Sequence, residues 1–319
     1  MNLWFIFWSA IYDKLWSLWK WTAHKCTGNC EIQRLCCSSN NTGAERSKAI
    51  EYSIVKSKSQ VLKKMNAELS RLADSQLLTN KWILFEKYID ETVVLKEIDT
   101  KTHVDFIPAY RICLVHIYGY KQLIRQIHNM RSIICDPRNS AHQKMLQNLW
   151  SQLMDEPLSG VHSKQWQDIG FQGPDPSLDL RSMGLLALDN LLFFVTVYRE
   201  MARNTLQHSL HPTQGYPFAW VGINLTQLVL KLLLDGHLKT HFYNCFQRIF
   251  KIEDFHKVYS YLYTKFDKLW IDKTQESEQN FYYIISQFES QLTEQLADDK
   301  TVLSWEASQS RPVVETKLW

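Results

Sequence analysis

Residues 185–198 read LLALDNLLFFVTVY, and this stretch decides the fold. Wound as an α-helix, it is apolar on nearly every side. A helix without a polar face is buried in the middle of a protein core, because no side of it is suited to water. We therefore predict a helix over residues 185–198 at the centre of a hydrophobic core.

Helical patterns continue on both sides of this stretch. Apolar residues recur at helical spacing in residues 145–154, 255–270 and 281–292, and residues 106–130 hold a further apolar run with Pro108 near its start. One Lys-rich helix is expected to present an apolar face made of Ile50, Ile54, Val61, Leu62 and Met65. The 10 Gly and 8 Pro are few beside 15 Phe, 14 Tyr and 12 Trp, which favours packed helices over strands and turns. The predicted fold class is all-α, a helical bundle.

Composition and periodicity divide the chain into five predicted regions. Residues 38–47 are turn-rich and predict a loop, and the stretch beyond residue 298 has no apolar period. The regions are a Trp-rich amphipathic helix (1–24), a Cys-containing linker (25–47), an N-terminal helical region (48–130), a main helical domain (131–297) and a disordered tail (298–319).

Charge and cysteine usage narrow the class of protein. Lys and Arg number 36 against 33 Asp and Glu, a net charge of +3, which is too mild to indicate nucleic-acid binding. Seven cysteines, an odd number in a chain of this size, indicate free thiols in the reducing cytoplasm. Cys26, Cys30, Cys36 and Cys37 lack the paired C-x2-C spacing of a zinc site, so free thiols are expected, with palmitoylation as an alternative.

The motifs of several enzyme classes are missing from the sequence. There is no G-x4-G-K-[ST] loop, so the chain is not expected to hydrolyse nucleotides itself. G-x-S-x-G, H-E-x-x-H and G-x-G-x-x-G are also absent. His208 and His211 flank a predicted helix end and are interpreted as solvent-facing or capping residues rather than a metal pair. We expect neither a metal nor a cofactor.

The first 21 residues hold five Trp. On a helix of about 100° per residue, Trp4, Trp8 and Trp19 share one arc and Trp16 lies at its edge. The apolar run of residues 3–12 is too short to span a bilayer. Indole rings suit the membrane interface, which predicts a helix lying on a membrane through these four Trp. The alternative is a helix that docks on the protein's own core.

The segment WQDIGFQGPDPSLDLRSMGLLAL, residues 166–188, carries the functional hypothesis. Its aromatic and apolar residues can anchor a loop, while its glycines and prolines enforce tight turns and its aspartates suit capping of backbone N–H groups. The residues expected to position this loop are Trp166, Gly170, Phe171, Gln172, Asp175, Pro176, Asp179 and Gly184, and Gly173 is expected to help enforce a tight turn.

Arg181 lies in this segment close to the start of the predicted core helix. A cation there opposes the helix dipole, so local stability does not explain it. An arginine on a rigid loop is suited to contact a partner's phosphates. The alternative is an ion pair of Arg181 with Asp175 or Asp179.

The segment closely resembles the signature of the ELMO-domain-containing (ELMOD) family. The matching positions are Trp166, Gly170-Phe171-Gln172, Asp175-Pro176, Asp179, Arg181 and Gly184-Leu185-Leu186. Leu178, Leu180 and Ser182 depart from the family's usual Thr, Phe and Gly, which puts the detailed geometry of the loop in question. The resemblance extends over most of the chain and identifies residues 131–297 as the ELMO domain.

The resemblance implies a function for the loop. The short ELMOD proteins act as GTPase-activating proteins on GTP-bound Arf and Arf-like small GTPases. By this resemblance, Arg181 of the present chain is the catalytic arginine, supplied in trans. It also suggests a cytoplasmic protein, peripheral on the endoplasmic reticulum, lipid droplets or mitochondria. The alternative is a non-catalytic helical scaffold or membrane adaptor that binds small GTPases or their regulators.

Overall fold

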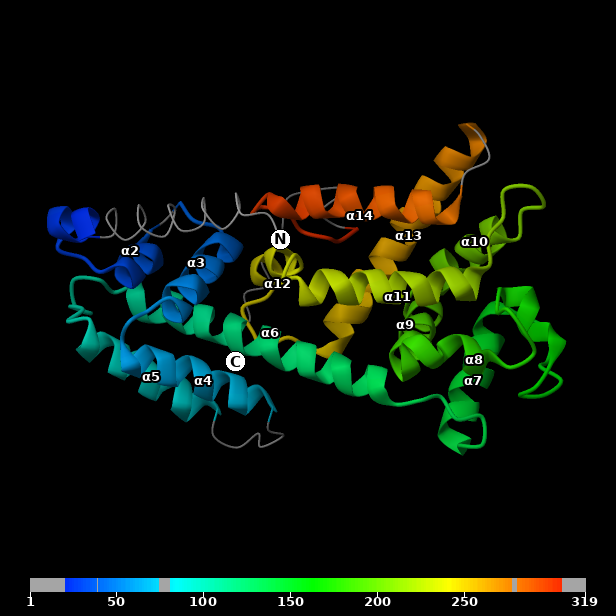
Figure 1. Ribbon diagram of the computed structural model, residues 1–319, viewed down its shortest axis with the longest axis horizontal. Coiled ribbons are helices and arrows are strands. Elements are labelled where there is room, and N and C mark those ends of the chain that lie inside the picture. The colour runs from blue at the N-terminus through cyan, green and yellow to red at the C-terminus, as the bar shows by residue number, and fades with distance from the viewer. Residues whose placement is uncertain (1–20, 39, 75–80, 277–279, 306–319) are drawn as a thin grey trace, which may run out of the picture. The chain divides into compact units, whose positions relative to one another are not determined.

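A computed structural model of the protein describes residues 21–38, 40–74, 81–276 and 280–305. Within these ranges every regular element is a helix, which confirms the predicted all-α fold (Figure 1). The chain forms two compact units, residues 1–118 and 119–319, and the division falls within helix α6. The predicted membrane-binding residues Trp4, Trp8, Trp16 and Trp19 lie outside the described residues.

The first unit is built from short helices and the first half of α6. These are α2 (Glu31–Cys37), α3 (Gly43–Val55), α4 (Gln60–Asp74), α5 (Lys81–Leu95) and α6 (Phe106–Ser132). Helix α6 carries Pro108 in its first turn, where a proline leaves no intrahelical hydrogen bond unmade, so the predicted helix over 106–130 is confirmed.

Two sequence predictions in the first unit are wrong. The predicted loop 38–47 is shorter, because the Thr42 hydroxyl accepts a hydrogen bond from the Glu45 N–H at 3.1 Å and caps α3, which begins at Gly43. The predicted Lys-rich helix is two helices, α3 and α4, separated at residues 56–59. Val61 is 37% exposed and does not belong to the buried face.

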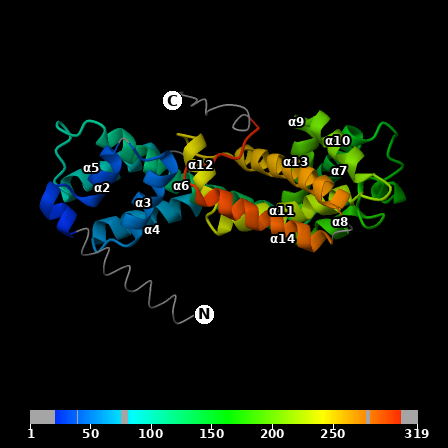
Figure 2. The ribbon, with the colours of Figure 1, turned by 90° about the horizontal axis from the view of Figure 1, so that it is seen from above.

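The second unit contains the predicted core helix and its neighbours. Its elements are α7 (Ser140–Leu153), the 3-10 helix η1 (Lys164–Ile169), α8 (Pro176–Asp179), the 3-10 helix η2 (Leu180–Ser182), α9 (Gly184–Val197), α10 (Arg199–Ser209), α11 (Phe218–Leu234), α12 (Lys239–Cys245), α13 (Ile252–Glu276) and α14 (Phe281–Ala297). Helix α13 packs on both α11 and α14 (Figure 2).

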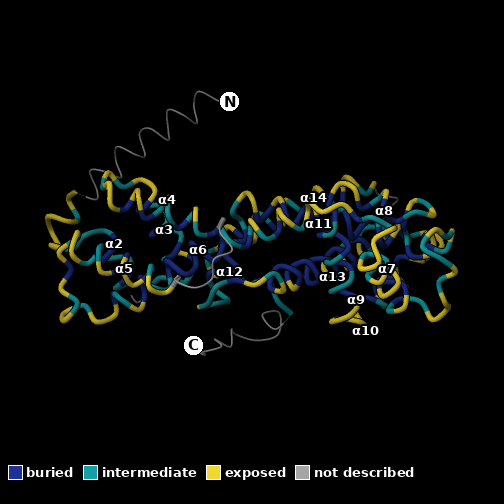
Figure 3. The backbone as a smooth tube through the Cα atoms, turned by 90° about the horizontal axis from the view of Figure 1, so that it is seen from below, coloured by how far each residue is buried: buried dark blue, intermediate teal, exposed yellow. Residues whose placement is uncertain are grey.

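Helix α9 is the centre of the second unit, as predicted. It packs against α7, α10, α11 and α13, and Leu191, Phe194 and Val195 are fully buried. Figure 3 draws most of α13 in the colour of buried residues. At the carboxyl end of α9 the prediction is too broad, since Val197 is 53% exposed.

A buried polar network ties α9 to its neighbours. Asn190 donates to Thr226 Oγ1 of α11 at 3.1 Å and accepts from His256 Nδ1 of α13 at 2.7 Å. His256 Nε2 lies 3.1 Å from a carboxylate oxygen of Asp189. A buried amide with both ends paired fixes the register of the three helices, because any slip would leave polar atoms unsatisfied.

The predicted stripes on the last two helices hold to different degrees. The stripe of residues 255–270 is buried throughout, and in α14 Ile284, Phe288 and Leu292 are buried. Residues 298–305 differ from the predicted disordered tail. Leu303 is 2% exposed, and its N–H donates to His241 Nδ1 at 3.1 Å.

None of the described helices is by itself both long and apolar enough to cross a bilayer. Two sharply bent helix pairs, residues 176–182 with α9 and α11 with α12, reach that length and composition together.

Candidate functional site

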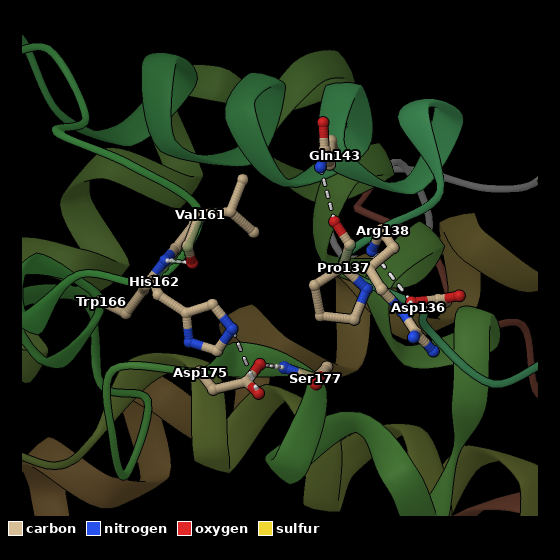
Figure 4. Close-up of polar contacts among 9 residues, drawn as sticks. All are labelled: Asp136, Pro137, Arg138, Gln143, Val161, His162, Trp166, Asp175 and Ser177. Carbon is tan, nitrogen blue, oxygen red and sulfur yellow. Dashed lines mark hydrogen bonds and ion pairs between the residues drawn. The ribbon is translucent and has the colours of Figure 1, made fainter.

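Trp166 is the anchor of the segment between α7 and α9. Its side chain is fully buried and lies edge-to-face against Trp150 at 5.6 Å and Phe171 at 5.5 Å between ring centroids. The indole N–H donates to the carbonyl of Val161 at 2.9 Å (Figure 4). The ring is therefore packed and its N–H is hydrogen-bonded inside the protein, as its predicted positioning role requires.

Two glycines fix the path of the backbone. Gly170 has φ +85°, and a Cβ there would lie 2.3 Å from the backbone nitrogen of Phe218. Gly184 has φ +56°, and a Cβ there would lie 2.2 Å from the carbonyl oxygen of Arg131. No other residue type fits either place without moving backbone. Gly173 lies in a bend over residues 172–174, but its φ is not in the left-handed region and no atom lies within 4 Å of such a Cβ, so the bend does not require glycine there.

The loop between α10 and α11, residues 210–217, and the first turn of α11 support Gly170. The Gly170 carbonyl accepts from the N–H of Trp220 at 3.1 Å, in the first turn of α11. The supporting loop is held in turn by the buried Asp267, which accepts from the Tyr216 hydroxyl at 2.6 Å and from His208 Nδ1 at 2.8 Å. The side chain of His208 is 47% exposed, as predicted, and it is also a partner of a buried carboxylate, which was not predicted.

Asp175 and Pro176 start helix α8. The Asp175 carboxylate accepts from the Ser177 N–H at 3.0 Å as the N-cap, and Pro176 occupies the first turn, where its missing N–H costs nothing. His162 Nε2 lies 3.9 Å from the other carboxylate oxygen (Figure 4). The predicted capping role of Asp175 is confirmed.

Asp179 closes the loop on itself. Its carboxylate accepts from the backbone N–H of Gln172 at 2.8 Å. Burial raises the pKa of Asp179, and this outweighs the opposing effect of that N–H. Gln172 takes part through its backbone, while its side chain is exposed.

Arg181 lies in η2, between two anchored neighbours. Leu180 is fully buried and Met183 is 2% exposed, whereas Arg181 is exposed. Within the described ranges, the guanidinium has no hydrogen bond or ion pair. The alternative of an ion pair with Asp175 or Asp179 is not seen, because both carboxylates bind backbone N–H groups instead.

The structure places the three departures from the family pattern. Leu180 fills the buried position where Phe is usual, and Leu178 is 50% exposed where Thr is usual. Ser182 does not need the freedom of the usual glycine, because its φ is not positive; Glu97 is the non-glycine residue with positive φ in the described part of the chain. The Ser182 carbonyl accepts from Arg131 Nε at 3.3 Å.

The described residues contain no group of three His, Cys, Asp or Glu side chains arranged for a metal ion. The seven cysteines are free thiols, and Cys36, Cys113 and Cys135 among them are buried. Sequence reasoning missed the contribution of residues 131–133, which contact η2 through the side chain of Arg131 and α9 through the carbonyl of Ile133. The exposed pair Ile133-Ile134 at the end of an amphipathic helix was the available signal.

Comparisons with known proteins identify the family of the chain. The sequence model of the ELMO/CED-12 family matches residues 125–285. ELMO domain-containing protein 2 of mouse is 38% identical over 299 residues, covering 93% of this chain and 97% of that protein. Human ELMO domain-containing protein 1 is 34% identical over 315 residues, with 91% and 90% covered.

ELMO domain-containing protein B of Dictyostelium discoideum is 32% identical over 283 residues, with 88% of this chain and 94% of that protein covered. No solved structure matches the chain significantly. The chain belongs to the ELMO/CED-12 family, among its ELMO domain-containing proteins.

Proposed function

We propose that the protein activates GTP hydrolysis by an Arf or Arf-like small GTPase and that Arg181 is the arginine it supplies. One observation carries the proposal: Arg181 is exposed and unpaired within the described ranges, although Leu180 and Met183 on either side are buried. A backbone this firmly held would present the guanidinium to a partner at little cost in conformational entropy.

The chemistry of GTP hydrolysis explains why an arginine is needed. Negative charge spreads over the γ-phosphate oxygens and the β–γ bridge as the bond to the leaving group breaks. A guanidinium contacting these oxygens stabilises the transition state more than bound GTP, and such a residue is worth roughly 10³–10⁵ in rate. The described residues have no metal-binding group of their own, and the reaction asks for none beyond the magnesium that accompanies GTP.

Single-turnover hydrolysis by a panel of GTP-loaded Arf and Arf-like proteins tests the proposal. The protein should accelerate at least one of them, and Arg181→Lys should lose nearly all of the acceleration, because lysine keeps the charge but not the planar fork. Arg199→Lys is the matched control, since Arg199 is also exposed in the second unit. Binding without acceleration by the wild type would favour the scaffold alternative.

We also propose that residues 1–24 hold the protein on a cytosol-facing organelle membrane, where its GTPase partners gather. The Trp-rich pattern of this segment supports the proposal. Trp21, the first described residue, is 60% exposed, so this part of the segment does not bury its indole against the protein.

A further inference from the structure

Residues 131–134 run beside the arginine loop. Arg131 Nε donates to the carbonyl of Ser182 at 3.3 Å, and the carbonyl of Ile133 accepts from the Leu185 N–H at 2.9 Å. Both contacts follow Arg181 in sequence, one at the next residue and one in the first turn of α9. The end of α6 and the arginine loop therefore form one continuous surface.

The same surface continues toward helix α8. Burial, and to a lesser degree the carboxylate of Asp175, raises the pKa of the buried Cys135 thiol to about 11. Figure 4 shows the ring of Pro137 next to Ser177 of α8, whereas the Asp136 carboxylate points away from Asp175. Leu178 lies within α8 and precedes Arg181 by less than one helical turn.

Three large aliphatic side chains are exposed on this surface. Ile133 is 47%, Ile134 68% and Leu178 50% exposed. Single exposed aliphatic residues are ordinary, but a group of them from two segments that meet beside an unpaired arginine is typical of the contact region of a protein partner.

The charges of this surface fit a partner that carries phosphates. Arg131 is exposed and contacts the carbonyl of Ser182, the residue next to Arg181, whereas Arg138 is exposed and paired with Asp136 at 3.3 Å. The nearby carboxylates of Asp175 and Asp179 are half-buried and accept backbone N–H groups, so they add little repulsion toward an anion. Apolar contact beside a cationic centre complements a protein whose own apolar surface borders a bound nucleotide.

We propose that Ile133, Ile134 and Leu178 form the docking surface for the GTP-bound small GTPase, seating it so that Arg181 reaches the phosphates. The inference rests on the proposed function and assigns a division of roles within it. The aliphatic residues bind the GTPase equally in the ground and transition states, whereas Arg181 acts in the transition state. Arg131 is a positioning residue, because it holds the carbonyl of Ser182 next to the arginine.

The two roles predict different kinetic changes. Ile134→Asp and Leu178→Asp should each raise the activator concentration that gives half-maximal acceleration by about tenfold or more, because a charge is placed in an apolar contact. The maximal accelerated rate should stay close to that of the wild type. Arg181→Lys should do the reverse, lowering the maximal rate while the half-maximal concentration changes little.

The experiment measures single-turnover hydrolysis by the most strongly accelerated GTPase of the panel over a range of activator concentrations. Val197→Asp is the matched control, since Val197 is 53% exposed at the far end of α9. It should leave both quantities unchanged. All three aliphatic positions are exposed, so far-ultraviolet circular dichroism should show normal folding in every variant.

Three outcomes overturn the inference. In the first, Ile134→Asp and Leu178→Asp both keep the half-maximal concentration of the wild type. In the second, Val197→Asp raises the half-maximal concentration as much as they do. In the third, the two aspartate variants lower the maximal rate without raising the half-maximal concentration. Failure of the proposed function gives a different result, because the wild type then accelerates no GTPase at any concentration. In that case the proposed docking surface is refuted as well.

Discussion

Gly184 shows how much of the site depends on a single residue. Its φ is +56°, and a Cβ at this position would lie 2.2 Å from the Arg131 carbonyl oxygen, which leaves no space for a side chain. Gly184→Ala should cost about 1–3 kcal/mol of stability from backbone strain alone and should displace η2, thereby weakening acceleration of GTP hydrolysis. Urea denaturation and the single-turnover assay measure the two effects.

Gly173→Ala is the comparison for that variant, because it adds the same methyl group in the same loop. Its φ is ordinary and the space around it is open, so stability should change by less than about 0.5 kcal/mol. Equal losses in both variants would mean that the loop tolerates no added methyl group at all, and the specific role of Gly184 would be refuted.

Asp179 should make the stability of the protein depend on pH, and the direction of its raised pKa fixes the sign of that dependence. Burial raises its pKa in the folded state above the usual value of 3.8, so its contribution to stability is fully present below that value and is lost as the pH rises through the folded pKa. Asp179→Asn keeps an oxygen for the Gln172 N–H and removes the buried charge. The variant should therefore gain stability relative to the wild type as the pH is raised from about 3.8 to neutrality. Thermal unfolding of both proteins across this range checks the direction, and a relative loss would contradict it.

At the scale of the element, α9 should dominate the stability of the second unit. Phe194 is fully buried and its ring lies 5.2 Å from that of Tyr263 on α13. Phe194→Ala should lower the free energy of unfolding by about 3–5 kcal/mol, through lost burial and the cavity that remains. Val197→Ala, at an exposed position of the same helix, should cost less than about 0.5 kcal/mol. Urea denaturation midpoints compare the two, and similar losses would show that α9 is not the core helix.

The elements with strong apolar periods could be predicted from the sequence. The uniform apolarity of residues 185–198 and the stripe of residues 255–270 each reflect burial by neighbouring helices. The break between α3 and α4 was missed because Ile50, Ile54, Leu62 and Met65 keep an apolar face in both helices. Periodicity records which residues are buried and is blind to where one helix ends and the next begins.

The site was predictable where its contacts are local in sequence. The N-cap of Asp175 and the closure from Asp179 to Gln172 join residues at most seven apart. The contacts of Arg131 with Ser182 and of Gly170 with Trp220 join residues about fifty apart. Nothing in local spacing encodes such pairs, because the packing of whole helices brings them together.

At the scale of the whole molecule, the N-terminal segment should determine where the protein acts. Deletion of residues 1–24 should abolish co-sedimentation with liposomes but leave acceleration of GTP hydrolysis in solution unchanged. Replacing Trp4, Trp8 and Trp19 together by Ala should have the same effect, since indole rings supply most of the affinity for the headgroup region. Equal binding by full-length and truncated protein would indicate that the segment docks on the protein instead.

Membrane attachment would act on the rate through concentration rather than chemistry. A GTPase and its activator on one surface meet far more often than the same two proteins in solution. The full-length protein should therefore surpass the truncated form when the GTPase is itself bound to liposomes, and the two should be equal when it is free.

The exposed guanidinium of Arg181 has a genetic consequence. Because it contributes no contact to the described fold, an allele that replaces it would escape quality control and accumulate to normal abundance. Such a product would still occupy the GTPase through Ile134 and Leu178 while leaving its nucleotide intact. It would shield the active GTPase from a working copy of the activator, so heterozygous carriers would be more affected than carriers of a deletion.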